Sequence, residues 1–552
     1  MTVVLNIIIV ALIALITYWW ANQGLLSSVL HFMCVLVAGA LAFALWEPVT
    51  VGLLLSGGGF DNYAWGVSLV MMFVLLLTFF RLLCDKLVPD NANLPHVLNM
   101  IFGGVFGLGS GIISIGILMI GCGFLQSTTD IMGFTGTIRS SQNGGQPMKD
   151  STIFPPIVEW TADFYSMLSL GSLAPNVRNT PMAYYYPDLD QVATSLHRDS
   201  FDWGYGKTSI VPDAVIIKSL DYVGDMSMGD MPGQGCYIVQ VEFDQTAYDN
   251  GGQLTVSASQ VRLLGSNGAS NRGDSIAVHP IAWVQASAKS PSNLYVFDDV
   301  SHYATSVPGR QQATVDFIFP GTEFRQDYPP RFIQIKGVRF KLPAISTQQL
   351  TLADWGSQLA SANQQGSGDS TDFSSAPLLG ADTLRINNNI QPLRISSNML
   401  SPMKQVDRYI TSGHKSFPRG GNFNVSRDLM IRGFEEPAGT VIVKLDISRK
   451  TSDADIHEIR SIVPRDTPIE LVDNKGYTYS PIGYFWTRSD DIEMKFDPIN
   501  GLRTMDLIPN LPSSGVQKLE LIYRVTDGVK IVGLKVGDKV VGRLNLNIKG
   551  KR

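Results

Sequence analysis

Long apolar stretches dominate the first quarter of the chain. About 20 apolar residues, in a range that admits about 17, are enough for a helix to cross the ~30 Å of hydrocarbon in a bilayer. Four stretches reach this length, and tryptophans stand at several of their ends, where indole rings favour the headgroup level. The pattern predicts a membrane domain over residues 1–126. Its four transmembrane helices are expected at residues 3–20, 25–46, 64–80 and 97–125.

A second pattern begins after residue 235, where apolar residues recur at every second position. This period is typical of β-strands with one buried face. Residues 237–243 and 315–319 alternate in this way, and their polar positions, among them Asp316, are expected to face solvent. In residues 333–342 the alternation slips by one position at Gly337, as a β-bulge would make it slip.

The β-type layout occurs twice. Residues 480–484 repeat the pattern of residues 279–283, 201 positions earlier, and four further segments agree in order and spacing. Such agreement predicts two related antiparallel β-sandwich domains, at residues 236–346 and 438–549. Each has close to the ~100 residues and seven short strands of an immunoglobulin-like domain.

Three segments of different character connect these parts. Residues 127–235 form a juxtamembrane segment with one amphipathic helix at residues 156–170, which either lies on the membrane surface, caps the bundle, or is an ordinary core helix. Residues 347–390 are rich in Ser, Gln and Gly and predict a flexible linker. Residues 391–437 are expected to form an irregular extension of the second sandwich.

Charge is unevenly distributed between these regions. The chain has 43 Lys and Arg against 48 Asp and Glu residues, of which only six fall in residues 1–126. The remainder has about the charge density of a soluble domain. The balance of charge excludes a strongly basic nucleic-acid-binding protein, so no nucleic-acid partner is expected.

The few charges of the membrane domain predict its orientation. Arg81 and Lys86 lie between the third and fourth spans, whereas Glu47 and Asp61 lie between the second and third. By the positive-inside rule the loop with the basic residues is cytoplasmic, and the region after the fourth span faces outward. The opposite orientation is favoured by two later basic residues, Arg139 and Lys149.

Glycines mark one face of the fourth predicted span. Gly103, Gly107 and Gly111 are four residues apart and therefore align along one side of a helix. In lipid, small residues let helix backbones approach closely. The face is expected to pack inside the four-helix bundle. The alternatives are a contact between copies in a homo-oligomer and the lining of a passage.

The sequence contains none of the common catalytic or metal-binding motifs. HExxH, GxSxG and Walker-type GxxxxGK[ST] patterns are absent, the four cysteines form no CxxC pair, and the seven histidines are scattered singly. No ionisable residue lies in the middle of a predicted span, where transporters and pumps commonly carry one. We therefore expect a protein that is not an enzyme and uses no cofactor or metal.

Three features of the N-terminal region resemble those of a known family. They are the four-span hydropathy, the short first turn Asn22-Gln23-Gly24, and the glycine-punctuated run Val97–Gly107. Together they resemble the colicin V production protein (CvpA-like) family, over roughly residues 1–170. Family members usually carry arginine beside these glycines, and this chain does not. The resemblance implies a multi-pass protein of the bacterial inner membrane with a role in toxin production or export, or in envelope homeostasis.

The sequence as a whole predicts a membrane protein with binding domains. The β-sandwiches are expected to bind or scaffold envelope or secreted partners outside the cytoplasm. The alternative is a channel or export component in which the sandwiches form a collar over an oligomeric pore. Besides a protein partner, the lipid bilayer and a homo-oligomer are the expected associations.

Overall fold

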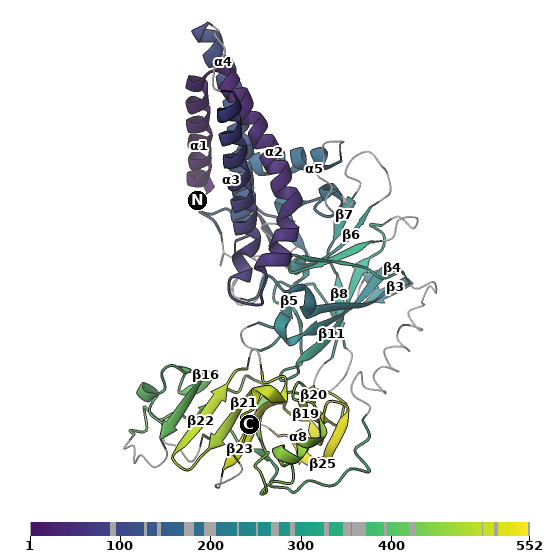
Figure 1. The fold of residues 1–552 in the computed structure, drawn as a ribbon. Helices are drawn as coiled ribbons and strands as arrows, with labels where there is room; N and C mark the ends of the chain where they lie inside the picture. Colours follow the sequence, from purple (N-terminus) through teal and green to yellow (C-terminus); the bar gives the residue numbers. More distant parts are fainter. Residues whose placement is uncertain are drawn as a thin grey trace.

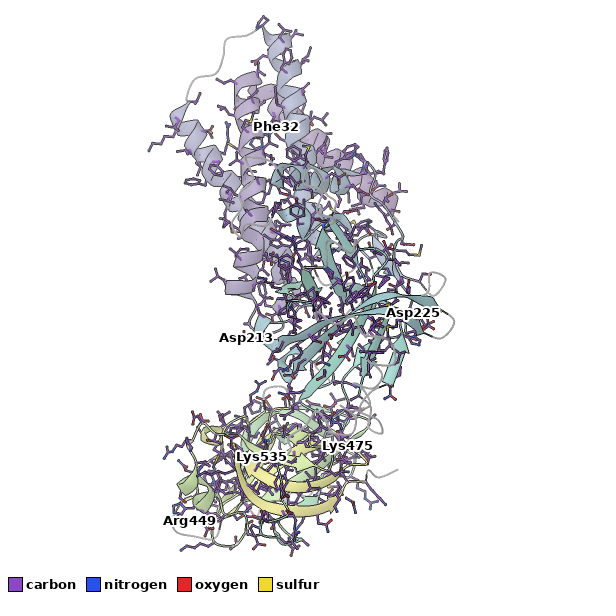
Figure 2. The ribbon with its side chains drawn as sticks, turned by 90° about the vertical axis from the view of Figure 1, so that its right-hand side faces the viewer. Phe32, Asp213, Asp225, Arg449, Lys475 and Lys535 are labelled. Atoms are coloured by element: carbon purple, nitrogen blue, oxygen red, sulfur yellow. The ribbon has the colours of Figure 1, made fainter. Side chains whose placement is uncertain are left out.

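The structure is a computed structural model in which helices occupy one end and two β domains follow below them (Figure 1). Figure 2 shows the same order from another side, with Phe32 on the helices, Asp225 on the first β domain and Arg449 on the second. The residues described are 2–88, 95–125, 130–140, 145–170, 181–192, 206–228, 231–249, 252–266, 275–286, 293–324, 330–345, 355, 371–390, 395–418, 425–498, 501–512 and 517–549.

Four long helices form the N-terminal bundle. All four are long and apolar enough to cross a membrane, which confirms the predicted apolar helices. They are α1 (Thr2–Gln23), α2 (Leu25–Val49), α3 (Asp61–Leu87) and α4 (His96–Gly123), and a π-helical turn, η1 (Thr50–Leu54), continues α2. Glu47, expected in a loop, lies inside α2 and is buried.

The helices run alternately up and down. The α1–α2 turn lies beside the start of α4, where the Leu25 amide donates a hydrogen bond to the Asn99 side chain. The α2–α3 connection lies at the other end, which faces the β domains, and the N-terminal end of the shorter α1 points in the same direction (Figure 1). The end of α3 that carries Arg81 and Lys86 is therefore on the far side of the bundle from both β domains.

Small elements connect the bundle to the first β domain. They include the amphipathic helix that the sequence predicts at residues 156–170. Their bounds are β1 (Thr137–Arg139), β2 (Pro147–Lys149) and α5 (Ile157–Ser169). Two further short strands, β5 (Thr255–Val256) and β10 (Ala304–Thr305), pair with each other within the first β domain.

The first β domain consists of two antiparallel sheets with a shared core. Val239 and Phe317 from one sheet and Leu263 from the other belong to a buried cluster that continues into the helical bundle. One sheet contains, in spatial order, β3 (Val215–Met228), β4 (Met231–Asp244), β11 (Gln312–Pro320), β8 (Ala282–Gln285) and β9 (Asn293–Val296). The other contains β13 (Val338–Lys341), β12 (Phe332–Ile335), β6 (Val261–Ser266) and β7 (Ser275–Val278).

The second β domain has the same plan with added strands. Its larger sheet contains β14 (Leu384–Ile386), β18 (Thr440–Asp446), β23 (Lys518–Thr526), β21 (Gly483–Thr487), β22 (Asp491–Phe496), β16 (Tyr409–Pro418) and β15 (Lys404–Val406), with β17 (Gly433–Phe434) beside β16. Its smaller sheet contains β20 (Thr478–Tyr479), β19 (Ile469–Asp473), β24 (Lys530–Val536) and β25 (Lys539–Asn547), and one helix, α8 (Ile456–Ile462), follows β18.

The strand orders of the two domains correspond. The order β3-β4-β11-β8-β9 matches β14-β18-β23-β21-β22, and β13-β12-β6-β7 matches β25-β24-β19-β20. Each matched strand occupies the same place in the chain order of its domain. The matched strands of the two domains therefore follow one another in corresponding spatial orders.

Two local predictions were wrong. The first β domain begins with β3 at Val215 rather than at residue 236, because β3 pairs along the length of β4. The phase slip at Gly337 is a hairpin turn rather than a bulge: Lys336 and Gly337 have φ of 43° and 87° and join the antiparallel strands β12 and β13. Positive φ at both central residues is typical of a type I′ turn, which shifts the alternation as a bulge does.

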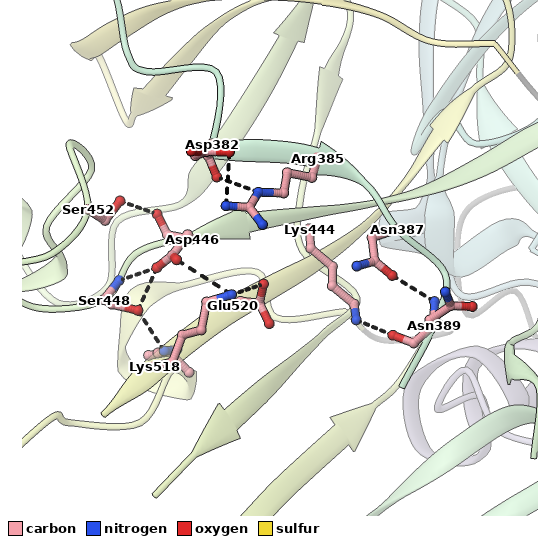
Figure 3. A network of polar contacts seen from close by, with 11 residues as sticks. Asp382, Arg385, Asn387, Asn389, Lys444, Asp446, Ser448, Ser452, Lys518 and Glu520 are labelled. Carbon is pink, nitrogen blue, oxygen red and sulfur yellow. Dashed lines mark hydrogen bonds and ion pairs between the residues drawn. The ribbon is translucent and has the colours of Figure 1, made fainter. Parts of the chain in front are cut away.

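The predicted linker, residues 347–390, is shorter than expected. Its last part, residues 371–390, belongs to the second β domain, where β14 pairs with β18 and Lys444 donates a hydrogen bond to the backbone oxygen of Asn389 (Figure 3). The buried Phe373 and Leu379 anchor this segment despite its polar composition. Residues 347–354 and 356–370 lie outside the described residues.

The extension at residues 391–437 is also more regular than predicted. It supplies β15, β16 and β17, and β16 pairs with β22 from Gly413 to Pro418. Ile410 and Phe434 from the extension pack on Ile522, on the outer face of the larger sheet. That face, expected to meet solvent, is therefore covered by a further apolar layer.

Candidate functional site

The glycine face of α4 lies against α1. A Cβ atom added to Gly103 would stand 3.0 Å from a backbone oxygen of α1, and the corresponding distances at Gly107 and Gly111 are 3.1 and 3.3 Å. Contacts of this length allow no larger side chain without separation of the two helices. The face is therefore occupied by a helix of the same chain.

The two residues that predict the orientation have different surroundings. Arg81 forms an ion pair with Asp85, donates a hydrogen bond of 2.9 Å to the Ser27 hydroxyl, and lies 5.1 Å from the centre of the Trp20 ring. Lys86 is exposed near the end of α3. The side chain of Arg81 is thus held by several contacts, and both basic residues lie at the end of the bundle that is remote from the β domains.

The helix α5 packs against the side of the bundle. A Cβ atom on Gly116 of α4 would stand 2.0 Å from the Thr161 hydroxyl, and the Tyr165 hydroxyl donates a hydrogen bond of 3.3 Å to the backbone oxygen of Val35 in α2. Glycine at position 116 is thus required by the close approach of α5. Among the three roles predicted for this helix, these contacts correspond to the one in which it caps the bundle.

The opposite side of α5 carries exposed aromatic and apolar residues. Trp160 and Met167 are about half exposed, and Phe154, just before the helix, is 72% exposed. The Phe154 amide donates a hydrogen bond of 3.1 Å to the side chain of Asn6, near the start of α1. Phe154 therefore lies level with the N-terminal end of α1, and the rest of α1 extends from there toward the far end of the bundle.

A buried ion pair joins the C-terminal part of α2 to the first β domain. Arg339 of β13 reaches Glu47 of α2 with two contacts, 3.2 Å from Nε to Oε1 and 3.1 Å from Nη2 to Oε2. Both side chains are less than a tenth exposed. The Arg339 guanidinium also stacks 4.1 Å from the centre of the Tyr185 ring.

The same junction is packed with tryptophan. The Trp46 indole donates a hydrogen bond of 2.8 Å to the backbone oxygen of Trp65, and both rings are buried. The type I′ turn at Gly337 packs closely against Trp65: a Cβ atom added to Gly337 would stand 2.8 Å from the indole nitrogen. The helices and the first β domain therefore share one continuous interior.

A buried lysine, Lys336, and a half-buried one, Lys207, complete the junction. The Lys336 ammonium lies 3.7 Å from the Asp249 carboxylate, and the Lys207 amide donates a hydrogen bond of 2.6 Å to the same carboxylate. Burial lowers the pKa of both lysines, and the negative charge of Asp249 opposes that effect. Sequence reasoning missed Lys336 because a single lysine in a β-type pattern usually faces solvent, and it missed Lys207 because that residue lies in an irregular segment.

A cleft separates the two β domains. Its walls are held together by hydrogen bonds from Thr526 Oγ1 to the backbone oxygen of Pro308, 2.7 Å, and from Gln311 Nε2 to the backbone oxygen of Ser480, 3.1 Å. A cavity of about 450 Å³ opens between these contacts. Buried Arg310 lines it, with its guanidinium stacked on the ring of Tyr477 at 3.1 Å from the ring centre.

The described residues contain no group of three or more His, Cys, Asp and Glu side chains that could hold a metal ion. Cys236, the one cysteine outside the apolar region, is fully buried. The arrangement around the cleft supplies charged and hydroxyl groups for non-covalent binding. No protein-family model matches the chain, and no curated protein and no solved structure is significantly similar to it.

Proposed function

We propose that this protein is a non-enzymatic membrane scaffold whose two β domains present binding surfaces to envelope or secreted partners. The observation that carries the proposal is the buried ion pair between Glu47 and Arg339, at 3.1 and 3.2 Å. A domain that shares its interior with a helical bundle keeps a fixed orientation to the membrane. Fixed orientation is what a scaffold needs to present a partner repeatedly in one geometry.

The strand order of the β domains supports an immunoglobulin-like fold, which hosts many binding functions. In that fold one sheet has the order A-B-E-D and the other contains C, F and G. The strands β3, β4, β11 and β8 stand in the positions of A, B, E and D, and β6, β12 and β13 in those of C, F and G. The second domain offers the same correspondence through β14, β18, β23 and β21.

The resemblance of residues 1–170 to CvpA-like proteins supports a place in the bacterial inner membrane, with a role in toxin production or export or in envelope homeostasis. The charges of Arg81 and Lys86, at the end of the bundle opposite the β domains, support an orientation with the β domains outside the cytoplasm.

The orientation is tested with single cysteines in a variant without native cysteines. Asp213→Cys lies on an exposed position of the first β domain (Figure 2), and Val88→Cys lies at the far end of the bundle. We expect a membrane-impermeant maleimide to label Asp213→Cys in spheroplasts and Val88→Cys only after the membrane is opened. The reverse pattern would place the β domains in the cytoplasm and overturn the envelope role.

The scaffold role is tested against the channel role by reconstitution into lipid vesicles. We expect the vesicles to retain entrapped ions and a small fluorescent dye, because the described bundle packs its glycine face against its own α1. Release of either would overturn the scaffold proposal and favour an oligomeric pore with a β-domain collar. Size measurement in detergent on the same sample gives the number of chains in the particle.

A further inference from the structure

Arg310 is placed between the two β domains by the loop that precedes β11. The loop turns at Gly309, whose φ is 84°, and a Cβ atom there would stand 2.8 Å from the backbone of Val525 in β23. Glycine is thus needed both for its backbone conformation and for the close approach of the second domain. The Arg310 side chain that follows is 4% exposed.

The guanidinium of Arg310 has unsatisfied hydrogen-bond donors. Its Nε, Nη1 and Nη2 atoms are all buried, and none has a hydrogen-bond partner among the described residues. Stacking on Tyr477 at 3.1 Å covers a face of the guanidinium plane, while the N–H groups point outward within that plane. A buried donor without an acceptor costs about 1–3 kcal/mol and more when it is charged, so this arrangement points to an acceptor that the chain itself does not supply.

Two of the three carboxylates that line the cavity, Glu470 and Glu242, are paired with lysines. Glu470 lies 3.2 Å from the ammonium of Lys535, and Glu242 lies 3.0 Å from that of Lys218. Both pairs leave the donors of Arg310 unused. Lys475 is a second cation close enough to interact with Arg310: burial lowers the pKa of Lys475, and the charge of Arg310 lowers it further.

The cavity has the size and lining of a binding site. Its volume of about 450 Å³ lies within the ~300–1,000 Å³ of typical ligand sites. Hydroxyl groups from both domains line it beside Arg310, namely those of Thr305, Ser306, Thr314, Tyr477 and Thr478. A ligand there would contact both β domains at once.

We propose that the cleft between the β domains binds a carboxylate, with the planar guanidinium of Arg310 donating two parallel hydrogen bonds to its oxygens. Guanidinium and carboxylate match in planar, two-point geometry. The negative charge of Asp538 on the same wall repels a doubly charged anion such as phosphate more strongly than a singly charged carboxylate. The inference rests on the binding role proposed for the β domains and names the ligand class of one surface.

The carboxylate has two sources that the experiment separates, the C-terminus of a peptide and a free hydroxy acid. The full-length protein in detergent is titrated by calorimetry with trialanine, trialanine amide, gluconate and inorganic phosphate. We expect trialanine or gluconate to bind, and trialanine amide and phosphate to bind at least about tenfold more weakly, because neither offers a singly charged planar acceptor. Trialanine alone identifies a peptide terminus, and gluconate alone a free acid.

The variant Arg310→Met should lose at least about tenfold in affinity for the bound probe. Its matched control is Arg488→Met, since Arg488 also stacks on an aromatic ring, that of Trp486, but is paired with Asp491 and Glu493. If Arg310→Met does not fold, Arg310→Lys keeps the charge without the planar fork and should weaken binding while it retains the fold.

Three results would overturn the inference. They are no binding of either carboxylate to the wild type, equal affinity in the Arg310 variant, and phosphate affinity equal to that of the carboxylates. The scaffold proposal can fail independently of the carboxylate proposal, because release of dye from vesicles and binding measured by calorimetry in detergent are separate measurements. If the protein binds a carboxylate and also releases dye from vesicles, the proposed binding site in the cleft stands and the scaffold proposal is rejected.

Discussion

Arg339 and Glu47 are 292 residues apart in the sequence and form a two-point ion pair within the interior shared by the helices and the first β domain. Nothing in the sequence around either residue indicates that the two form a pair. Their contact fixes how the β domains stand on the membrane helices, so it is the first relationship to test.

We predict that Glu47→Gln and Arg339→Met each destabilise the protein by about 3–5 kcal/mol, because each leaves an uncompensated charge in the junction. The double variant should recover most of that loss. Chemical unfolding in detergent gives the four free energies of the cycle. The partly exposed pair Lys218–Glu242 is the control, with an expected effect below about 1 kcal/mol. Additive losses in the double variant would contradict a direct interaction.

We predict that Gly116→Ala loosens α5 from the bundle. Its Cβ atom would stand 2.0 Å from the Thr161 hydroxyl and 2.9 Å from the backbone oxygen of Ile157, so the expected loss is about 1–3 kcal/mol. Gly104→Ala in the same helix is the matched control, since its Cβ would be 3.7 Å from its nearest neighbour, Ala21. The control should be neutral or stabilising by up to about 1 kcal/mol. Thermal unfolding and proteolysis at α5 measure both, and equal behaviour would refute the close contact.

We predict that Asp316 makes the protein less stable as pH rises from about 4 to 6. Burial raises its pKa to about 6 despite the hydrogen bond of 3.0 Å from Gln240. The folded state therefore holds the proton over a range in which the unfolded state has lost it, and stability decreases by about 2–3 kcal/mol across that range. Asp316→Asn should match the wild type at pH 4 and exceed it at pH 7. Parallel stability curves for the two proteins would disprove the effect.

We predict the opposite slope from Lys444 at alkaline pH. Burial lowers its pKa to about 8, while an unfolded lysine titrates near ~10.4. The unfolded state binds more protons between these values, so stability should rise from about pH 8 to pH 10. Lys444→Met should flatten that rise, although it leaves the Asn389 carbonyl without its donor. The measurement is unfolding free energy against pH, and an unchanged slope in the variant would count against the buried charge.

The alternating pattern predicted the inner faces of the strands but not the state of the outer ones. Phe317 and Val443 are buried in the domain cores, as alternation requires. Asp316 and Lys444 occupy the outward positions and are also buried. The reason is that other segments cover the outer faces, with Trp355 in the cluster over the first domain and Phe434 in the cluster over the second. A covering layer supplied from elsewhere in the chain leaves no periodic trace in the strand beneath it.

The candidate cleft was beyond sequence reasoning for a similar reason. Arg310 stands alone in a Gly-Arg-Gln loop, and Tyr477 lies in a turn of the other domain. Neither belongs to a motif, and their contact arises only when the two β domains are placed side by side. The signal that could have indicated the loop is Gly309, which precedes Arg310 and has a positive φ.

By itself, the sequence determined the apolar helices, the strands of the cores and their repeated order, because burial in lipid or in a sandwich imposes a local period on the chain. Only the tertiary structure decided which charges are buried, that α5 and the first β domain pack against the bundle, and that the guanidinium of Arg310 lacks a hydrogen-bond partner among the described residues. These depend on contacts between residues far apart in sequence, for which local hydrophobic periodicity carries no information.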